Sequence, residues 1–209
     1  MPDGTLLLGF IAASLVVLLI PGPGVLYVVA RSVGQGQRAG LTSVLGLSAG
    51  ALVHVAATTA GLSAILLTSA TAFGVVKTLG AGYLIYLGLR TLLTRSPLLG
   101  VQAAKPISLH RVFTDGVIVN VFNPKIAVFF LAFLPQFVDS GKGPVTQQIL
   151  LLGSIYIVIG LITDGAYAIL ADRLRHLLGR RVTSSPLPRY LSGSLYLGLG
   201  LHTALTGRR

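Results

Sequence analysis

The sequence contains no cysteine and no glutamate, and only 10% of its 209 residues are charged. Soluble proteins carry about 25% charged residues. The lack of cysteine excludes a disulfide framework, a thiolate metal site and thiol-based redox chemistry. With 53% hydrophobic residues and a mean hydropathy of +0.84, the chain has too little polar surface for a water-soluble domain. The composition therefore predicts an integral membrane protein.

Acidic residues are the scarcer of the two charged classes. The chain has 16 Lys and Arg against 5 acidic residues, a net charge of +11 and an isoelectric point of about 10.8. In a soluble protein this excess would indicate nucleic-acid binding. Here the basic residues lie between long apolar runs and form no patch, so we expect a lipid bilayer as the partner and no nucleic acid.

Six apolar stretches are long enough to cross a membrane, for which a helix needs roughly 20 residues. The first stretch has Asp3 and no Lys or Arg before it, so it is interpreted as a retained helix and not as a secretory signal. The predicted spans cover residues 6–30, 41–67, 73–93, 115–138, 145–171 and 190–205. The sequence thus predicts an all-α, multi-pass membrane protein with six transmembrane helices.

Basic residues gather in alternate connections between these spans. The first, third and fifth connections contain Arg31, Arg38, Arg90, Arg95, Lys105, Arg111, Arg173, Arg175, Arg180, Arg181 and Arg189. The second connection has no basic residue and the fourth has only Lys142. The positive-inside rule therefore places the odd connections in the cytoplasm and both termini outside. Arg208 and Arg209 oppose this assignment, but they lie in a short tail.

The third connection, residues 94–114, is the one linker-like segment, because it is rich in proline, glycine and polar residues. We interpret residues 1–209 as a single transmembrane domain that this linker divides into halves 1–93 and 115–209. Each half holds three predicted spans, and an odd number makes the halves insert in opposite orientations. This is the topology of inverted-repeat transporters.

Gly46 and Gly50 form a GxxxG pattern in the second predicted span. Such small residues let helices approach closely, either within the chain or across a homodimer interface. We interpret intramolecular packing as their main role and keep a homodimer as the alternative. His54, which follows on the same apolar run, is interpreted as a packing residue.

The motif Pro21-Gly22-Pro23-Gly24 interrupts the first predicted span. Proline lacks a backbone N–H and clashes with the preceding helical turn, so two prolines and two glycines are expected to break the helix. The freed backbone groups need other partners, and we predict that these four residues contribute to substrate binding. A simple kink is the structural alternative.

A second interruption lies in the fourth predicted span, where Asn120 precedes Asn123-Pro124-Lys125. Asn followed by Pro has the form of a helix N-cap with proline at the first helical position, so a second half-helix is expected to begin there. Its free N–H groups and positive dipole end, beside the Lys125 ammonium, would form a seat for a carboxylate. We therefore predict that these four residues bind substrate. The alternative places Lys125 at the lipid interface.

Asp164 is the only acidic residue well inside a predicted span. Acids within the membrane are costly and functional by default, although such a residue can also hold a neighbouring helix by hydrogen bonds. A rise of about 1.5 Å per residue places Asp164, Asn123 and the first break at similar depth, roughly 10 to 14 Å from the inner surface. We expect that they can meet in one site, with Asp164 as the proton-coupling residue.

Taken together, these segments resemble the LysE/RhtB family of bacterial amino-acid exporters over essentially the whole chain. The segments that carry the resemblance are 21–24, 36–46, 80–90, 120–125, 129–130, 134–137 and Asp164. The resemblance implies an inner-membrane exporter of amino acids or close derivatives, driven by proton exchange, with no ATP site, no other cofactor and no enzymatic activity. Substrates across the family range from basic amino acids through homoserine, threonine and cysteine-like compounds to lactones, so the resemblance does not fix the substrate.

Rival functions would need residues that this chain has few of. A membrane enzyme needs a nucleophile or a metal constellation, and a metal-ion exporter of a related fold needs several intramembrane oxygen ligands. The chain has one deep Asp and no Glu. A passive channel is the remaining alternative, and proton-flux measurements in liposomes would distinguish it from an antiporter.

The two intramembrane charges predict a mechanism. A lone charge in hydrocarbon is costly, so Lys125 and Asp164 are expected to be paired or bridged by water in the empty carrier. A zwitterionic substrate would replace this pairing, with its carboxylate at Lys125 and its ammonium at Asp164 or at carbonyls near Gly22. Substrate binding and protonation would then be coupled. With a single deep acid, we expect small neutral amino acids to be preferred over lysine or arginine.

Overall fold

The computed structural model describes most of the chain except two segments and the extreme N-terminus. The described residues are 4–68, 78, 82, 85, 86, 89 and 105–178. Within these ranges every regular element is a helix and none is a strand, in agreement with the predicted all-α class. The third and sixth predicted spans lie outside the described residues, apart from the isolated positions.

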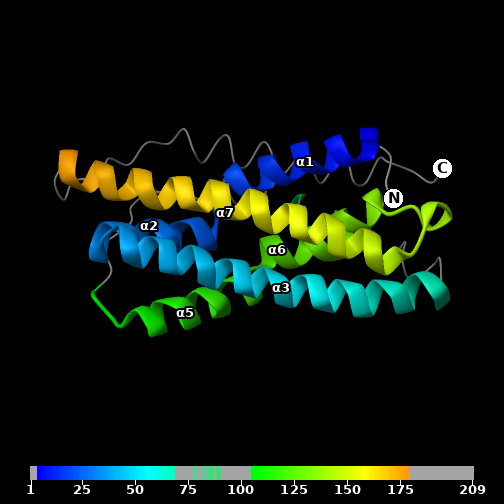
Figure 1. Cartoon of the computed structure of the whole chain (residues 1–209), viewed down its shortest axis with the longest axis horizontal. Helices are drawn as coiled ribbons and strands as arrows, with labels where there is room; N and C mark the ends of the chain where they lie inside the picture. Colours follow the sequence, from blue (N-terminus) through cyan, green and yellow to red (C-terminus); the bar gives the residue numbers. More distant parts are fainter. Residues whose placement is uncertain are drawn as a thin grey trace.

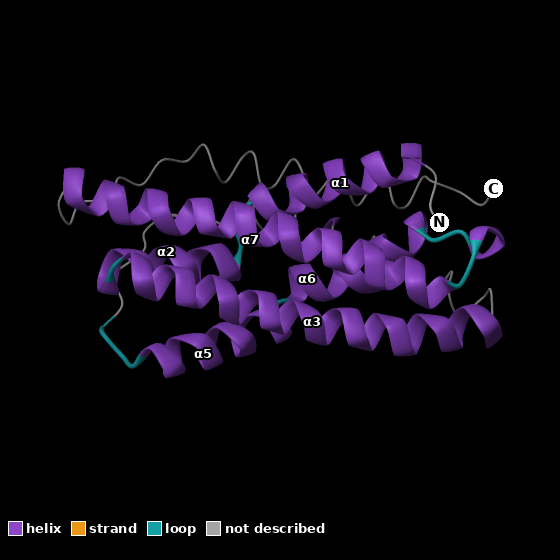
Figure 2. Cartoon of the chain, in the orientation of Figure 1, coloured by secondary structure: helices purple, strands orange, loops and turns teal. Residues whose placement is uncertain are grey.

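The described helices lie along one common long axis (Figures 1 and 2). In chain order they are α1 (Gly4–Leu19), α2 (Pro23–Gln35), α3 (Gln37–Thr68), α5 (Leu109–Val121), α6 (Pro124–Val128), η1 (Phe129–Phe133), η2 (Leu134–Phe137), η3 (Ser140–Lys142) and α7 (Val145–Leu178). The pairs α1 and α2, and α5 and α6, each follow one another along that axis.

Two unbroken helices correspond to the second and fifth predicted spans. The stretches Gln37–Gly61 of α3 and Val145–Leu174 of α7 are long and apolar enough to cross a membrane. α7 continues to Leu178, past the predicted end of its span at residue 171. No proline or glycine lies between residues 166 and 178, so the helix continues into the segment expected to be a loop.

The first and fourth predicted spans are broken at the proline-containing interruptions, as predicted. α1 and α2 are bent by 52°, and α5 is bent by 48° from the segment Pro124–Phe137. Gly22 has an extended backbone, with φ −130° and ψ −172°, so no continuous helix passes through it and the simple-kink alternative is wrong. Counted as single bent spans, these pairs bring the candidate membrane spans of the described ranges to four.

α5 begins at Leu109, earlier than the predicted start of the fourth span at Asp115. Ser108 precedes it with an extended backbone, and its hydroxyl accepts a hydrogen bond from Arg111 N at 3.3 Å. Serine is a favoured N-cap residue, so the helix starts as soon as this cap is available.

α3 and α5 approach so closely that glycines are needed where they cross. A methyl group on Gly46 would collide with the Phe113 carbonyl oxygen, and one on Gly50 would lie 2.7 Å from Asn120 Cβ. Gly116 of α5 faces Gly46 in the same contact. The GxxxG pattern therefore serves packing within the chain. A homodimer stays a prediction.

Aromatic side chains fill the half of the bundle that contains α1. The largest members of this core are Phe10, Phe129, Phe130, Phe133 and Tyr156. The ring centroids of Phe129 and Tyr156 are 4.7 Å apart, and those of Phe10 and Phe129 are 5.8 Å apart. These contacts attach α1 and the π-helical turn η1 to α7.

The segments that carry the basic connections share one end of the bundle. The end of α2, the segment that precedes α5 and the end of α7 all lie at the left of Figure 1. This arrangement agrees with the alternation predicted from the basic residues. The orientation of this end in the membrane and the inverted repeat stay predictions.

Candidate functional site

A small cavity lies where the breaks of both bent spans face α3 and α7. Its volume is about 30 Å³, which is room for about one or two water molecules. The predicted site residues that line it are Gly24, Asn120, Asn123, Lys125 and Asp164. Residues of the first, fourth and fifth predicted spans therefore meet in one place, as expected from their similar depth.

Lys125 reaches from α6 to the end of α1. Its Nζ donates hydrogen bonds to Val17 O at 3.1 Å and to Ile20 O at 3.0 Å. In an unbroken helix Val17 O would accept from the residue at position 21, but Pro21 has no N–H. The Lys125 residue is only 5% exposed, so the alternative that placed it at the lipid interface is wrong.

Residues of both breaks position this lysine. A methyl group on Gly22 would lie 3.1 Å from Lys125 Nζ and 3.2 Å from Cε, so the absence of a side chain makes room for the ammonium. On the other side, Asn123 caps α6, and its Oδ1 accepts from Lys125 N at 3.1 Å. Pro124 occupies the first helical position, as predicted. One side chain thus joins the two breaks.

Tyr167 contacts the first break from α7. Its hydroxyl donates to Leu19 O at 2.9 Å. Leu19 O has no helical donor, because that donor would be the missing N–H of Pro23. Tyr167 lies about one turn after Asp164. The helix that carries the buried acid is therefore attached to the first break.

His54 makes a similar contact at the second break. Its Nε2 lies 3.0 Å from Asn120 O, the carbonyl that loses its i+4 donor at Pro124 and accepts from Asn123 N at 3.0 Å instead. A carbonyl only accepts, so the contact assigns the proton to Nε2. The imidazole also stacks on Phe130 with ring centroids 5.9 Å apart, which agrees with a packing role. Asn120 Nδ2 donates to Leu47 O at 2.6 Å, so α3 holds Asn120 by two contacts.

Asp164 lines the cavity from α7 and is 9% exposed. Across residues 4–61 and 105–174, no ion pair or hydrogen bond to its carboxylate is present. The direct pairing expected with Lys125 is wrong for this conformation, because the two carbonyls at the end of α1 bind the ammonium instead. A water bridge between the two groups stays a prediction, since both line the same cavity.

The remaining predicted site residues, Pro21, Gly22, Pro23 and Pro124, do not line the cavity. They act on it through the backbone. Pro21 and Pro23 remove N–H donors and so free carbonyls of α1, Pro124 starts α6, and Gly22 leaves space for the lysine.

The neutral lining of the cavity was missed by reasoning from the sequence. Its members are Leu18, Val25, Leu47, Ser48, Ala51, Ile126, Tyr156, Ile157 and Gly160. Ile157 and Gly160 stand at i−7 and i−4 from Asp164, a spacing that places all three on one helix face and so was a usable signal. On α3, no charged residue marks which face of the apolar run is the functional one.

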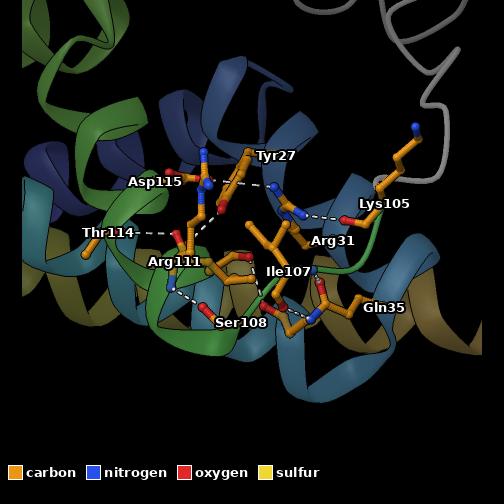
Figure 3. Close-up of polar contacts among 12 residues, drawn as sticks. Tyr27, Arg31, Gln35, Lys105, Ile107, Ser108, Arg111, Thr114 and Asp115 are labelled. Carbon is orange, nitrogen blue, oxygen red and sulfur yellow. Dashed lines mark hydrogen bonds and ion pairs between the residues drawn. The ribbon is translucent and has the colours of Figure 1, made fainter.

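A second polar cluster joins α2 to α5 and to the segment before it (Figure 3). Arg31 Nη1 donates to Lys105 O at 3.0 Å, and its Nη2 lies 3.8 Å from Asp115 Oδ2. Gln35 Nε2 donates to Ile107 O, and Ile107 N donates back to Gln35 Oε1 at 3.1 Å. α2 runs from the first break to this cluster, so the contacts hold α2 and α5 together between the cavity and the end of the bundle.

The model of the family described as LysE type translocator matches residues 15–207, which is nearly the whole chain. The chain belongs to this family. A homoserine/homoserine lactone efflux protein of Salmonella typhimurium is 32% identical over 165 residues, which cover 79% of this chain and 80% of that protein. A leucine efflux protein of Salmonella choleraesuis is 25% identical over 202 residues, with 93% and 92% covered.

An uncharacterized membrane protein of Vibrio cholerae is 30% identical to this LysE type translocator over 197 residues, covering 93% of this chain and 94% of that protein. No solved structure matches the chain. Family membership and the apolar helices agree on a membrane transporter. The cavity between the breaks is therefore the candidate substrate site of this translocator.

Proposed function

We propose that this translocator exports small neutral amino acids or close derivatives, with homoserine- and threonine-like compounds favoured, across the bacterial inner membrane in exchange for protons. The observation that carries the proposal is a cavity in which one lysine and one aspartate face a neutral lining. The relatives named for efflux of homoserine, homoserine lactone and leucine support the amino-acid class.

A zwitterionic substrate fits the two charges of this cavity. Its carboxylate would bind Lys125 and the N-terminal end of α6, and its ammonium would bind Asp164 or the carbonyls at the end of α1. A dibasic amino acid brings a second ammonium, for which the cavity lining offers no second acid. Small and aliphatic neighbours such as Ala51, Gly160 and Ile157 suit an uncharged side chain.

Transport requires this cavity to enlarge, because about 30 Å³ is far less than the volume of an amino acid with a side chain. The structure is consistent with a closed state in which the contacts of Arg31 and Gln35 hold α2 against α5. Alternating access in broken-helix transporters occurs by movement of helix groups around a central site. Asp164 is the acid in the described cavity lining that can carry a proton through this cycle.

A metal-ion exporter and a passive channel are the two alternative functions. In the described part of the chain, no three His, Cys, Asp or Glu side chains gather to hold a metal ion, so a metal-ion exporter finds no support there. A passive channel would move substrate without counter-movement of protons.

The test is transport by the purified protein in liposomes that contain a pH-sensitive dye. We expect homoserine, threonine and homoserine lactone to move with opposite proton movement, and lysine to be a weaker substrate. Lysine export with an affinity well above that for homoserine or threonine would refute the preference. Substrate flux without proton movement would indicate a channel, and Mn²⁺ flux would indicate a metal exporter. A reporter fused at residue 209 that is active in the cytoplasm would refute the proposed orientation.

A further inference from the structure

The Lys125 ammonium is bound by backbone carbonyls and not by a carboxylate. Val17 O and Ile20 O both accept from its Nζ, at 3.1 and 3.0 Å. These oxygens lie at the C-terminal end of α1, where the helix dipole is negative and favours a cation. A methyl group on Gly22 would lie 3.1 Å from the nitrogen, so the site is open enough for an ammonium to approach the backbone.

The chemistry of this site is not specific for lysine. Val17 O and Ile20 O offer two acceptors to a primary ammonium, and the α-ammonium of an amino acid is the same group. Homoserine, homoserine lactone and leucine, named in two relatives, share this ammonium, whereas the lactone has no free carboxylate. The group common to these compounds is therefore the one that the carbonyl pair can bind.

We propose that the Val17 and Ile20 carbonyls form the primary-ammonium site of this exporter, and that Lys125 occupies this site when no substrate is bound. The substrate ammonium competes with Lys125 for the carbonyls. The displaced Nζ then moves into the cavity, where Asp164 and the substrate carboxylate accept its hydrogen bonds. This inference rests on the proposed function, because it names the group by which the exporter selects its substrate.

If Lys125 competes with the substrate for the carbonyls, its removal has a different effect from the loss of a group that only binds the carboxylate. Removal of Lys125 takes away the binding partner of a carboxylate, but it also vacates the ammonium site. A substrate with a free carboxylate should therefore bind more weakly to the variant, whereas an ester or lactone of the same compound should bind more tightly than it binds to the wild-type protein.

The direct test uses Lys125→Ala, which leaves both carbonyls without their donor and opens a space for a small amine. Thermal unfolding of the detergent-solubilised protein is measured in ethylammonium chloride and, at equal concentration, in tetramethylammonium chloride, which has no N–H donor. We expect ethylammonium to raise the melting temperature of the variant by about 3–6 °C more than tetramethylammonium does, when it is present at about ten times its dissociation constant.

Wild-type protein and Lys105→Ala should show no such difference between the two amines. The Lys105 side chain is exposed, and only its backbone carbonyl makes a contact that positions α2. Equal responses of Lys125→Ala to both amines, or an ethylammonium effect of the same size in the wild-type protein, would overturn the proposal.

Lys125→Met provides a second measurement if Lys125→Ala does not fold, since methionine fills much of the lysine volume without a charge. We expect this variant to bind homoserine lactone several-fold more tightly than the wild-type protein does and free homoserine about tenfold more weakly. Unchanged or weaker lactone binding would overturn the inference. The amine measurement involves no transport, so failure of the wild-type protein to transport any amino acid would refute the proposed function and leave the ammonium site to be judged separately.

Discussion

Two regions of this translocator place an aspartate near a cation that also binds backbone carbonyls. In the central cavity, Lys125 contacts Val17 O and Ile20 O, and Asp164 lines the same space without a direct contact. At the end of α2, Arg31 contacts Lys105 O and lies 3.8 Å from Asp115. The two regions use similar groups in different surroundings.

The difference lies in exposure. Lys125 and Asp164 are 5% and 9% exposed, whereas the Arg31 and Asp115 side chains are 12% and 34% exposed. A buried charge loses hydration and depends on its few partners, while a partly exposed ion pair is screened and contributes about 0–1 kcal/mol. The central charges should therefore control function, whereas the outer pair should only adjust the stability of one helix contact.

The largest effect is expected from Asp164→Asn. Asparagine has nearly the same shape but carries no titratable proton, so proton-coupled export should be abolished while the protein still inserts and folds. Proton movement and substrate flux in liposomes measure this loss, with membrane extraction and melting temperature as controls for folding. Unchanged pH-dependent export by the correctly inserted variant would eliminate Asp164 as the coupling residue, although membership of the transporter family would be unaffected.

The next effect is expected from Gly22→Ala. Its methyl group would lie 3.1 Å from Lys125 Nζ, so the ammonium would have to move by a few tenths of an ångström relative to the carbonyls. We expect substrate affinity to change by about tenfold, equivalent to about 1.4 kcal/mol of overpacking. Gly9→Ala is the matched control, because its methyl group would meet only Phe137 Cε1 at 3.5 Å, an ordinary contact. Equal affinities in both variants would show that Gly22 does not position the lysine.

Sequence reasoning located both breaks because proline chemistry is local. A residue without an N–H cannot continue a helix, so Pro21, Pro23 and Pro124 mark the ends of elements whatever surrounds them. The buried acid was equally visible, since Asp164 is the single charge in its apolar run. The similar depth estimated for them in the membrane then predicted that these features can meet in one site.

The partners of the freed carbonyls were not predictable in this way. Lys125 was expected to pair with Asp164, directly or through water, because opposite charges attract. Its direct acceptors are instead backbone oxygens, which no sequence pattern displays. The contacts of Tyr167 and His54 depend on how helices far apart in the chain pack. Such contacts follow from tertiary geometry, and tyrosine or histidine in an apolar run is compatible with simple packing.

A smaller effect is expected from Tyr167→Phe, which removes the donor to Leu19 O. Pro23 leaves this carbonyl without a helical N–H, so the loss should cost about 1 kcal/mol and lower the melting temperature by about 2–4 °C. Tyr27→Phe is the matched comparison. Tyr27 OH donates to Val112 O at 2.8 Å, but this carbonyl lies inside α5 and keeps its helical donor. A larger loss in Tyr27→Phe than in Tyr167→Phe would contradict the role of the proline-freed carbonyl.

The smallest effect is expected from Asp115→Asn, which makes the same chemical change as Asp164→Asn at the other cation. The ion pair is long, at 3.8 Å, and partly exposed, so its loss should cost less than about 1 kcal/mol. Arg31 keeps its hydrogen bond to Lys105 O and its place 5.3 Å from the centre of the Tyr27 ring. Melting temperature and proton-coupled transport should therefore stay close to wild-type values, and high salt should remove any small difference in stability. If Asp115→Asn abolished coupling as completely as Asp164→Asn, burial would not be what separates the two aspartates, and the outer cluster would belong to the transport mechanism.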